Sequence, residues 1–170
     1  MDLKEAPRKP AQGRTLAEIL TTNKQLTSKQ AAEIASEVAA ALGFAHDNHV
    51  AHRDIKPANI LIGSNGQVKV ADFGIARAMN SATESNLTQA GSVMGTASYF
   101  SPEQAQGAQP DPRSDLYSLG IVMYEMLSGE RPFSRETTAE TMTAILKEEA
   151  PELLSGATPA LPEAILAMVR

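Results

Sequence analysis

The stretch His52-Arg53-Asp54-Ile55-Lys56-Pro57-Ala58-Asn59 contains an imidazole, two cations, a carboxylate and an amide within one short run. A solvated loop can contain any one of these side chains, and a lone His-x-Asp pair is usually structural. The order of the whole run is informative, because a base, a cation and an amide that can bind a metal follow one another closely. We therefore place the candidate catalytic turn here and work outward from it.

Further motifs follow this turn along the chain. Asp72-Phe73-Gly74 comes directly after an apolar run, and Ser101-Pro102-Glu103 lies downstream of it. Gly95-Thr96-Ala97-Ser98-Tyr99 precedes the latter motif, and Ser114-Asp115-Leu116-Tyr117-Ser118-Leu119-Gly120 follows it. Their order and spacing resemble the H-R-D-L-x-x-x-N, D-F-G and A-P-E motifs of protein kinases, with Ile55 in the Leu position. The chain resembles the C-terminal lobe (C-lobe) of the catalytic domain of a bacterial-type, eukaryotic-like Ser/Thr protein kinase.

The resemblance covers the chain from about Gly13 to its end and implies a mainly α (α+β) fold. We expect a helical kinase-like C-lobe with a small β-hairpin beside the catalytic loop and without the N-terminal lobe (N-lobe). Residues 1–13 carry prolines, alternating charges and almost no apolar side chains, which is typical of a flexible leader. Residues 14–170 would then be the C-lobe of a kinase catalytic domain, truncated at both ends.

The composition is that of one soluble domain. The chain has 170 residues, a net charge of −5 and no cysteine. The charge argues against nonspecific binding to nucleic acid, and the lack of cysteine excludes disulfides and thiol chemistry. We find no secretory signal and no apolar stretch long enough to span a bilayer. We therefore expect a cytoplasmic domain without a membrane segment of its own, although its parent protein could be membrane-anchored.

Helical periodicity and cap residues predict the main elements. A short helix is expected over Thr15–Thr22, and a longer helix should begin at a Thr27 or Ser28 cap and end near His46-Asp47-Asn48. Residues 115–127 are apolar on nearly all sides, Leu116 included, and should form the buried axis of the domain, stopped by Gly129. Further helices are expected over 137–148 and from 161 to the end of the chain, and residues 76–92 should form a long exposed loop.

A hairpin is predicted immediately after the catalytic turn. Ile60-Leu61-Ile62 and Gln67-Val68-Lys69-Val70 are β-prone runs that flank Gly63-Ser64-Asn65-Gly66, and an Asn-Gly pair in that position is a strong hairpin signal. The hairpin would hold Asn59 at one end and Asp72 at the other. The two side chains could then converge on the same corner despite their separation in sequence.

The resemblance implies a role in phosphoryl transfer for each residue of this corner. Asp54 would accept or orient the proton of the substrate hydroxyl, and Lys56 would bring its ammonium group to the transferred phosphate. Asn59 and Asp72 would hold Mg²⁺, because oxygen ligands suit this hard cation. Leu61 would lie under the adenine ring of ATP, where its alternative role is that of an ordinary hairpin core residue.

Other residues would support the site. His52 and Phe73 resemble packing residues that fix the catalytic loop and the metal motif. Asp115 resembles the carboxylate that accepts backbone hydrogen bonds from the catalytic loop, although it could instead be a simple helix cap. Glu103 resembles the acid that pairs with an arginine further along a kinase chain, and we expect that pair to be broken here.

Substrate class and regulation also follow from the resemblance. Lys56 and Thr96 on the substrate side are typical of the Ser/Thr branch rather than the tyrosine branch, so Ser/Thr residues of proteins are the expected acceptors. Arg53 resembles the residue that pairs with a phosphate on the activation loop. Thr88 is the first candidate for that phosphate, and the other candidates in the same loop are Thr83, Ser85 and Ser92.

Three kinase features do not occur in the sequence: a Gly-rich loop, a strand lysine for the α and β phosphates, and a helix glutamate to hold that lysine. An ATP site built from this chain would be open on one side, where the missing N-lobe is the expected partner, so we expect very slow phosphoryl transfer or none. A non-catalytic lobe that binds partners is therefore an alternative. A small-molecule phosphotransferase is a third interpretation, against which Thr96 and Ser101-Pro102-Glu103 count.

Overall fold

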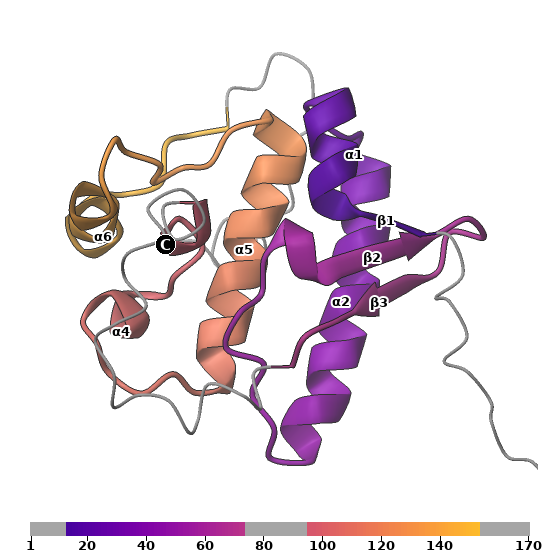
Figure 1. Ribbon diagram of the computed structural model, residues 1–170, viewed down its shortest axis with the longest axis horizontal. Coiled ribbons are helices and arrows are strands. Elements are labelled where there is room, and N and C mark those ends of the chain that lie inside the picture. Colours follow the sequence, from indigo (N-terminus) through magenta and orange to yellow (C-terminus); the bar gives the residue numbers. More distant parts are fainter. Residues whose placement is uncertain (1–12, 74–94, 154–170) are drawn as a thin grey trace, which may run out of the picture.

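The computed structural model describes residues 13–73 and 95–153 (Figure 1). The predicted leader, Thr83, Ser85, Thr88, Ser92 and the helix expected from residue 161 therefore lie outside the described residues, apart from Gly13. The described part is mainly helical with a small three-stranded antiparallel sheet. Its elements in chain order are β1 (Gly13–Thr15), α1 (Leu16–Asn23), α2 (Ser28–Asp47), the 3₁₀ turn η1 (Pro57–Asn59), β2 (Ile60–Gly63), β3 (Val68–Val70), α4 (Pro102–Ala105), α5 (Pro112–Ser128) and α6 (Thr138–Lys147).

Local cap chemistry explains where the helices begin. Thr15, Thr27 and Thr137 each accept a hydrogen bond from the backbone N–H three residues later, and a Glu or Gln side chain at that position accepts one from the cap backbone in return. The helices predicted in these three places are confirmed. Helix α5 begins earlier than predicted, at Pro112, because Asp111 is its N-cap and proline fits the first turn.

The predicted hairpin is confirmed, with Ile60 opposite Val70 and Ile62 opposite Val68. A third strand, which the sequence did not predict, pairs with its outer edge, where Thr15 lies opposite Leu61. The expectation of a two-stranded hairpin alone was therefore incomplete. The missed strand spans Gly13–Thr15, which is too short to show an alternating pattern of apolar and polar residues.

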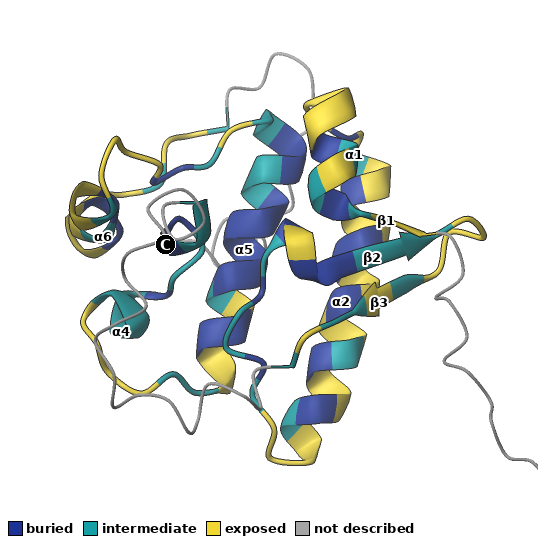
Figure 2. Ribbon diagram, viewed as in Figure 1, coloured by how far each residue is buried: buried dark blue, intermediate teal, exposed yellow. Residues whose placement is uncertain are grey.

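Helix α5 lies between two clusters of buried side chains (Figures 1 and 2). One face packs against α1 and α2 through residues such as Leu119, Val122 and Met126. The other contributes Ile121 to a smaller cluster with Phe133 and α6. Helix α5 is thus the buried axis, as predicted, except at Leu116, which is 38% exposed. The Leu116 side chain faces solvent, whereas Ser114 and Asp115 just before it are buried.

Two further observations complete the fold. Helix α5 ends at Gly129, as predicted, and Gly129 adopts a left-handed φ of 78° that glycine reaches without strain. Within the described ranges, no helix is long and apolar enough to cross a membrane.

Candidate active site

The catalytic loop is attached to the start of α5 through one buried carboxylate. Asp115 is 1% exposed, and its Oδ2 accepts a hydrogen bond of 2.7 Å from the backbone N–H of His52. Its Oδ1 accepts a second bond of 2.6 Å from the N–H of Arg53. The cap of α5 is instead Asp111, which accepts from the N–H of Arg113. Asp115 therefore contacts the catalytic loop rather than the helix end.

A third group contacts the same carboxylate. His46, at the end of α2, has its Nε2 2.8 Å from Asp115 Oδ2. From the sequence, His46 is expected only to mark the end of a helix, because nothing local indicates a partner 69 positions away. The pair joins α2, α5 and the catalytic loop at one point.

His52 links the catalytic loop to the strand that leads to Asp72. Its Nδ1 accepts a hydrogen bond of 3.2 Å from the N–H of Asp54, so its Nε2 must carry the proton that is donated to the carbonyl of Ala71, 2.9 Å away. The ring also packs on Phe73 with centroids 4.6 Å apart and planes tilted by 57°. This fully buried side chain thus sets the position of both motifs.

Asp54 lies among the polar groups that the sequence placed beside it. The Nζ of Lys56 is 3.0 Å from Asp54 Oδ2. The amide of Asn59 donates from Nδ2 to the backbone carbonyl of Asp54, at 2.8 Å, and to its Oδ2, at 3.2 Å. Because the nitrogen of the Asn59 amide faces Asp54, its Oδ1 is the atom that could bind a metal.

The hairpin brings Asn59 close to Asp72. The N–H of Ala71 donates to the backbone carbonyl of Asn59 at 2.8 Å, so the residue next to Asp72 is bonded directly to Asn59. Asp72 has a left-handed φ of 59°, which costs a non-glycine residue roughly 1–3 kcal/mol and is often found at functional sites. One amide oxygen and one carboxylate fit Mg²⁺, which usually takes few protein ligands and fills its shell with water and phosphate oxygens.

The segment around Thr96 and Ser101 closes the other side of the loop. Lys56 Nζ donates to Thr96 Oγ1 at 3.4 Å. Gln104 accepts a hydrogen bond of 3.0 Å from the N–H of Ser101 and donates one of 2.9 Å from Nε2 to the carbonyl of Arg53. Arg53 itself has a left-handed φ of 68°. Gln104 therefore ties the Ser101-Pro102-Glu103 motif to the strained turn before Asp54.

A protein kinase domain model matches residues 9–164 of the chain. The chain belongs to the protein kinase family. It is 47% identical over 137 residues to the serine/threonine-protein kinase PknB of Mycobacterium tuberculosis (strain ATCC 25618 / H37Rv), which covers 81% of this chain and 22% of the relative. For PrkC of Bacillus subtilis (strain 168) the identity is 44% over 140 residues, covering 82% and 21%. For the probable PknB of Corynebacterium glutamicum it is 52% over 126 residues, covering 74% and 19%.

These relatives are bacterial Ser/Thr protein kinases by name, and the chain is a PknB/PrkC-type kinase segment. It spans about a fifth of the length of the curated relatives that it matches. The fold expected from the resemblance, a mainly helical part of a kinase domain, is therefore confirmed.

Three other residues that the sequence predicts for the site are Leu61, Glu103 and Arg53. Leu61 lies partly exposed on β2, opposite Lys69 on β3. Glu103 accepts a hydrogen bond from the hydroxyl of Ser114, so a serine is its partner in the described part of the chain. Burial raises the pKa of the Glu103 carboxyl, but hydrogen bonds, first that from Ser114, outweigh burial and lower the pKa overall. Arg53 Nε is buried and has no hydrogen-bond partner among the described residues.

Gln104 is the site residue that sequence reasoning missed most clearly. The S-x-x-Q pattern at Ser101 indicates a helix cap, but it cannot indicate a bond to a loop 51 positions earlier.

We expect Gln104→Ala to lower the free energy of unfolding by about 1–2 kcal/mol, because it removes a cap contact and leaves the Arg53 carbonyl without its donor. Urea denaturation followed by circular dichroism measures this change. Gln106→Ala, at an exposed position two residues later, is the control and should change stability by less than about 0.5 kcal/mol.

Proposed function

We propose that this chain carries the phosphoryl-transfer residues of a Ser/Thr protein kinase that moves the γ-phosphate of ATP to protein hydroxyls. The observation that carries the proposal is the Asp54 carboxylate. It is held by Lys56 Nζ at 3.0 Å and by Asn59 Nδ2 at 3.2 Å, while Asn59 is joined through Ala71 to the corner that contains Asp72. The candidate base, the cation and the first candidate metal ligand therefore lie together, and the second candidate ligand, Asp72, follows the residue that is bonded to Asn59.

In the proposed reaction, the substrate hydroxyl oxygen forms a bond to the γ-phosphorus as the bond from that phosphorus to the β–γ bridging oxygen of ATP breaks. Asp54 takes the hydroxyl proton, and Lys56 offsets negative charge on the transferred phosphoryl group. Asn59 Oδ1 and the Asp72 carboxylate would hold Mg²⁺, which when bound neutralises phosphate charge. Leu61 would contact the adenine, as its partial exposure at the sheet allows.

The acceptor class rests on Lys56 and Thr96. Their hydrogen bond of 3.4 Å would fix the Thr96 segment against the residue that meets the phosphate, and the relatives named as serine/threonine-protein kinases support Ser and Thr as the acceptors. Arg53 is proposed to receive the phosphate of a modified activation loop, with Thr88 as the first candidate site. The buried Arg53 Nε that lacks a partner in the described residues supports this role.

We further propose that the segment alone transfers phosphate very slowly or not at all, because its sequence contains neither a Gly-rich loop nor the lysine and glutamate that usually hold the nucleotide phosphates. The same missing motifs favour the second candidate function, a kinase-like lobe that binds partners without catalysis. The two candidates make opposite predictions once a nucleotide-binding half is supplied.

The test is a chimera that joins the region preceding the matched segment of Bacillus subtilis PrkC to this chain at Gly13. We expect the chimera to transfer labelled phosphate from ATP to serine and threonine of a protein substrate, and removal of Mg²⁺ with EDTA to abolish transfer. Phosphoamino-acid analysis and peptide mapping identify the acceptors, including Thr88. A folded chimera that binds ATP but transfers no phosphate would contradict the kinase proposal and support the non-catalytic lobe.

A further inference from the structure

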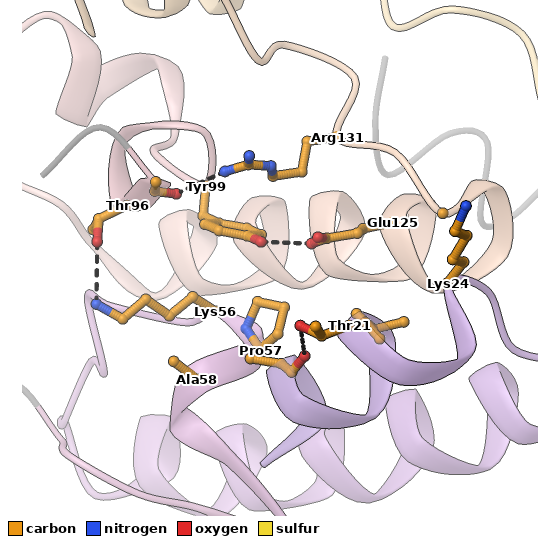
Figure 3. A pocket seen from close by; sticks show the side chains of 13 residues that line it. Thr21, Lys24, Lys56, Pro57, Ala58, Thr96, Tyr99, Glu125 and Arg131 are labelled. Atoms are coloured by element: carbon orange, nitrogen blue, oxygen red, sulfur yellow. Dashed lines mark hydrogen bonds between the residues drawn. The ribbon is translucent and has the colours of Figure 1, made fainter. Parts of the chain in front are cut away.

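A pocket of about 460 Å³ opens beside the catalytic loop, between α1 and α5 (Figure 3). Lys56 and Thr96 line it, so the pocket begins where the acceptor residue of a substrate would lie. Its other polar lining side chains are Thr21 on α1, Lys24 at the end of α1, Tyr99, Glu125 on α5 and Arg131 after α5. A volume of this size holds one or two side chains rather than a whole domain.

The charged side chains that line this pocket are three cations, Lys24, Lys56 and Arg131, and one carboxylate, Glu125, although the whole chain has a net charge of −5. Lys56 already pairs with Asp54 at 3.0 Å. Over residues 13–73 and 95–153, neither Lys24 nor Arg131 has a carboxylate oxygen within the 4.0 Å of an ion pair. Neither cation therefore forms an ion pair within the part of the chain that is described, although Arg131 lies near enough to Glu125 to lower the pKa of that carboxyl.

The single lining carboxylate is already engaged. Glu125 Oε2 accepts a hydrogen bond of 2.5 Å from the Tyr99 hydroxyl, shown as a dashed line in Figure 3. Burial raises the pKa of Glu125, an effect partly offset by the bond from Tyr99 and by the nearby charge of Arg131. Arg131 donates from Nη1 to the Gly95 carbonyl at 3.2 Å and to Ser98 Oγ at 3.4 Å. Its remaining N–H groups are the ones that could bind a ligand.

The backbone holds Lys24 in place at the end of the pocket opposite Lys56. Lys24 has a left-handed φ of 60°, and its N–H donates to the Leu20 carbonyl at 2.8 Å. A Cβ on Gly129 would lie 3.2 Å from the Lys24 carbonyl, so the α1 end packs directly on the α5 end. The N–H of Leu26 also donates to the Met126 carbonyl at 2.7 Å. The backbone of Lys24 is therefore held at this end of the pocket by the fold.

We propose that this pocket binds an acidic side chain of the protein substrate, within a few residues of the phosphorylated Ser or Thr, through Lys24 and Arg131. The inference rests on the proposed function, because Lys56 and Thr96 mark the acceptor position only if the chain acts on proteins. An extended peptide rises about 3.3 Å per residue, so a neighbouring side chain can reach a pocket that starts at Lys56. Partly buried charge pairs of this kind contribute to specificity and depend on salt.

Peptide binding to this chain without nucleotide tests the proposal. The probes are fluorescent peptides with one central threonine and neutral flanks, in which one position at a time carries Glu, Gln or Lys. We expect the Glu peptide to bind about tenfold more tightly than its Gln counterpart at one or two positions in fluorescence anisotropy at low salt. The preference should weaken as salt increases.

Charge reversal identifies the residues responsible. Lys24→Glu and Arg131→Glu should each remove the preference for Glu, and the Lys peptide should then bind more tightly. Lys29→Glu makes the same charge change at a side chain that is 86% exposed on α2, outside the pocket lining, and should retain the preference. Thermal denaturation checks the folding of Arg131→Glu, because that residue also contacts Gly95, whereas Lys24 is exposed.

Three outcomes would overturn the inference: tighter binding of Lys peptides to the unmodified chain, a Glu preference that survives Lys24→Glu, or no peptide binding at millimolar concentration. Tighter binding of Lys peptides would make Glu125 the recognition residue. The result is separable from the kinase proposal. If the chimera transfers no phosphate but Glu peptides still bind through Lys24, only the catalytic proposal fails; if transfer occurs without any charge preference, only this inference fails.

Discussion

Replacing Asp54 by asparagine in the chimera is expected to lower kcat about 10²–10⁴-fold, the usual contribution of a positioned general base. The amide is nearly the same size as the carboxylate but cannot accept the hydroxyl proton. The fold should be retained, because the shorter of the two Asn59 contacts, at 2.8 Å, is made to the backbone carbonyl of residue 54. The KM for ATP should change little.

Steady-state phosphate transfer at saturating ATP measures this effect. Asp47→Asn, which makes the same change at an exposed position at the end of α2, is the matched control and should retain full activity. A kcat for Asp54→Asn within threefold of the unmodified chimera would show that Asp54 is not the base. The site would then need another proton acceptor.

Removing the Asp115 carboxylate is expected to have the largest effect on stability. Asp115→Ala leaves the N–H groups of His52 and Arg53 without an acceptor in a buried place, and it removes the partner of His46. Each unsatisfied buried donor costs about 1–3 kcal/mol, so we expect the free energy of unfolding to fall by roughly 3–5 kcal/mol. Asp115→Asn keeps one acceptor oxygen and should lose less.

The start of the same helix supplies the control for this prediction. Asp111→Ala removes the N-cap of α5, whose side chain is 43% exposed, and should cost about 1 kcal/mol. Urea denaturation of the two variants gives the comparison. If Asp115→Ala were no more destabilising than Asp111→Ala, the buried carboxylate would be acting as an ordinary helix cap and not as the anchor of the catalytic loop.

Elements determined by local chemistry could be predicted from the sequence. The helices that begin at Thr27 and Thr137 have their cap residues and apolar periodicity within a few positions of each other. The hairpin is specified by Asn65-Gly66, where Gly66 adopts a φ of 81°. The relation of Asn59 to Asp72 followed from the hairpin, because pairing of its strands brings their ends together.

Contacts that join distant segments could not be predicted in this way. His46 and Gln104 lie in ordinary helical patterns, and only the packing of α2, α4 and α5 around the catalytic loop brings them to Asp115 and Arg53. Strand β1 was missed for a related reason, since its three residues become a strand only through pairing with β2. The left-handed backbone of Arg53 likewise has no signal in the residue type.

For the same reason, the sequence does not predict which charged side chains line the pocket beside Lys56. Lys24 and Arg131 are unremarkable basic residues in the sequence, separated by most of the domain. They line one pocket because the end of α1 packs on Gly129 at the end of α5. Substrate specificity in this segment would therefore depend on the contact between two helix ends, which composition and motif spacing do not report.

We propose that the hairpin makes Asn59 and Asp72 one metal site, and binding of Mn²⁺ in the presence of ATP is the measurement that decides this. Paramagnetic broadening of backbone amide signals reports distance from the metal on this chain itself. We predict that broadening is strongest around both Asn59 and Asp72 and disappears in Asp72→Asn, while Asp111→Asn leaves it unchanged. Broadening centred elsewhere, or unchanged in Asp72→Asn, would show that Asn59 and Asp72 do not form one metal site.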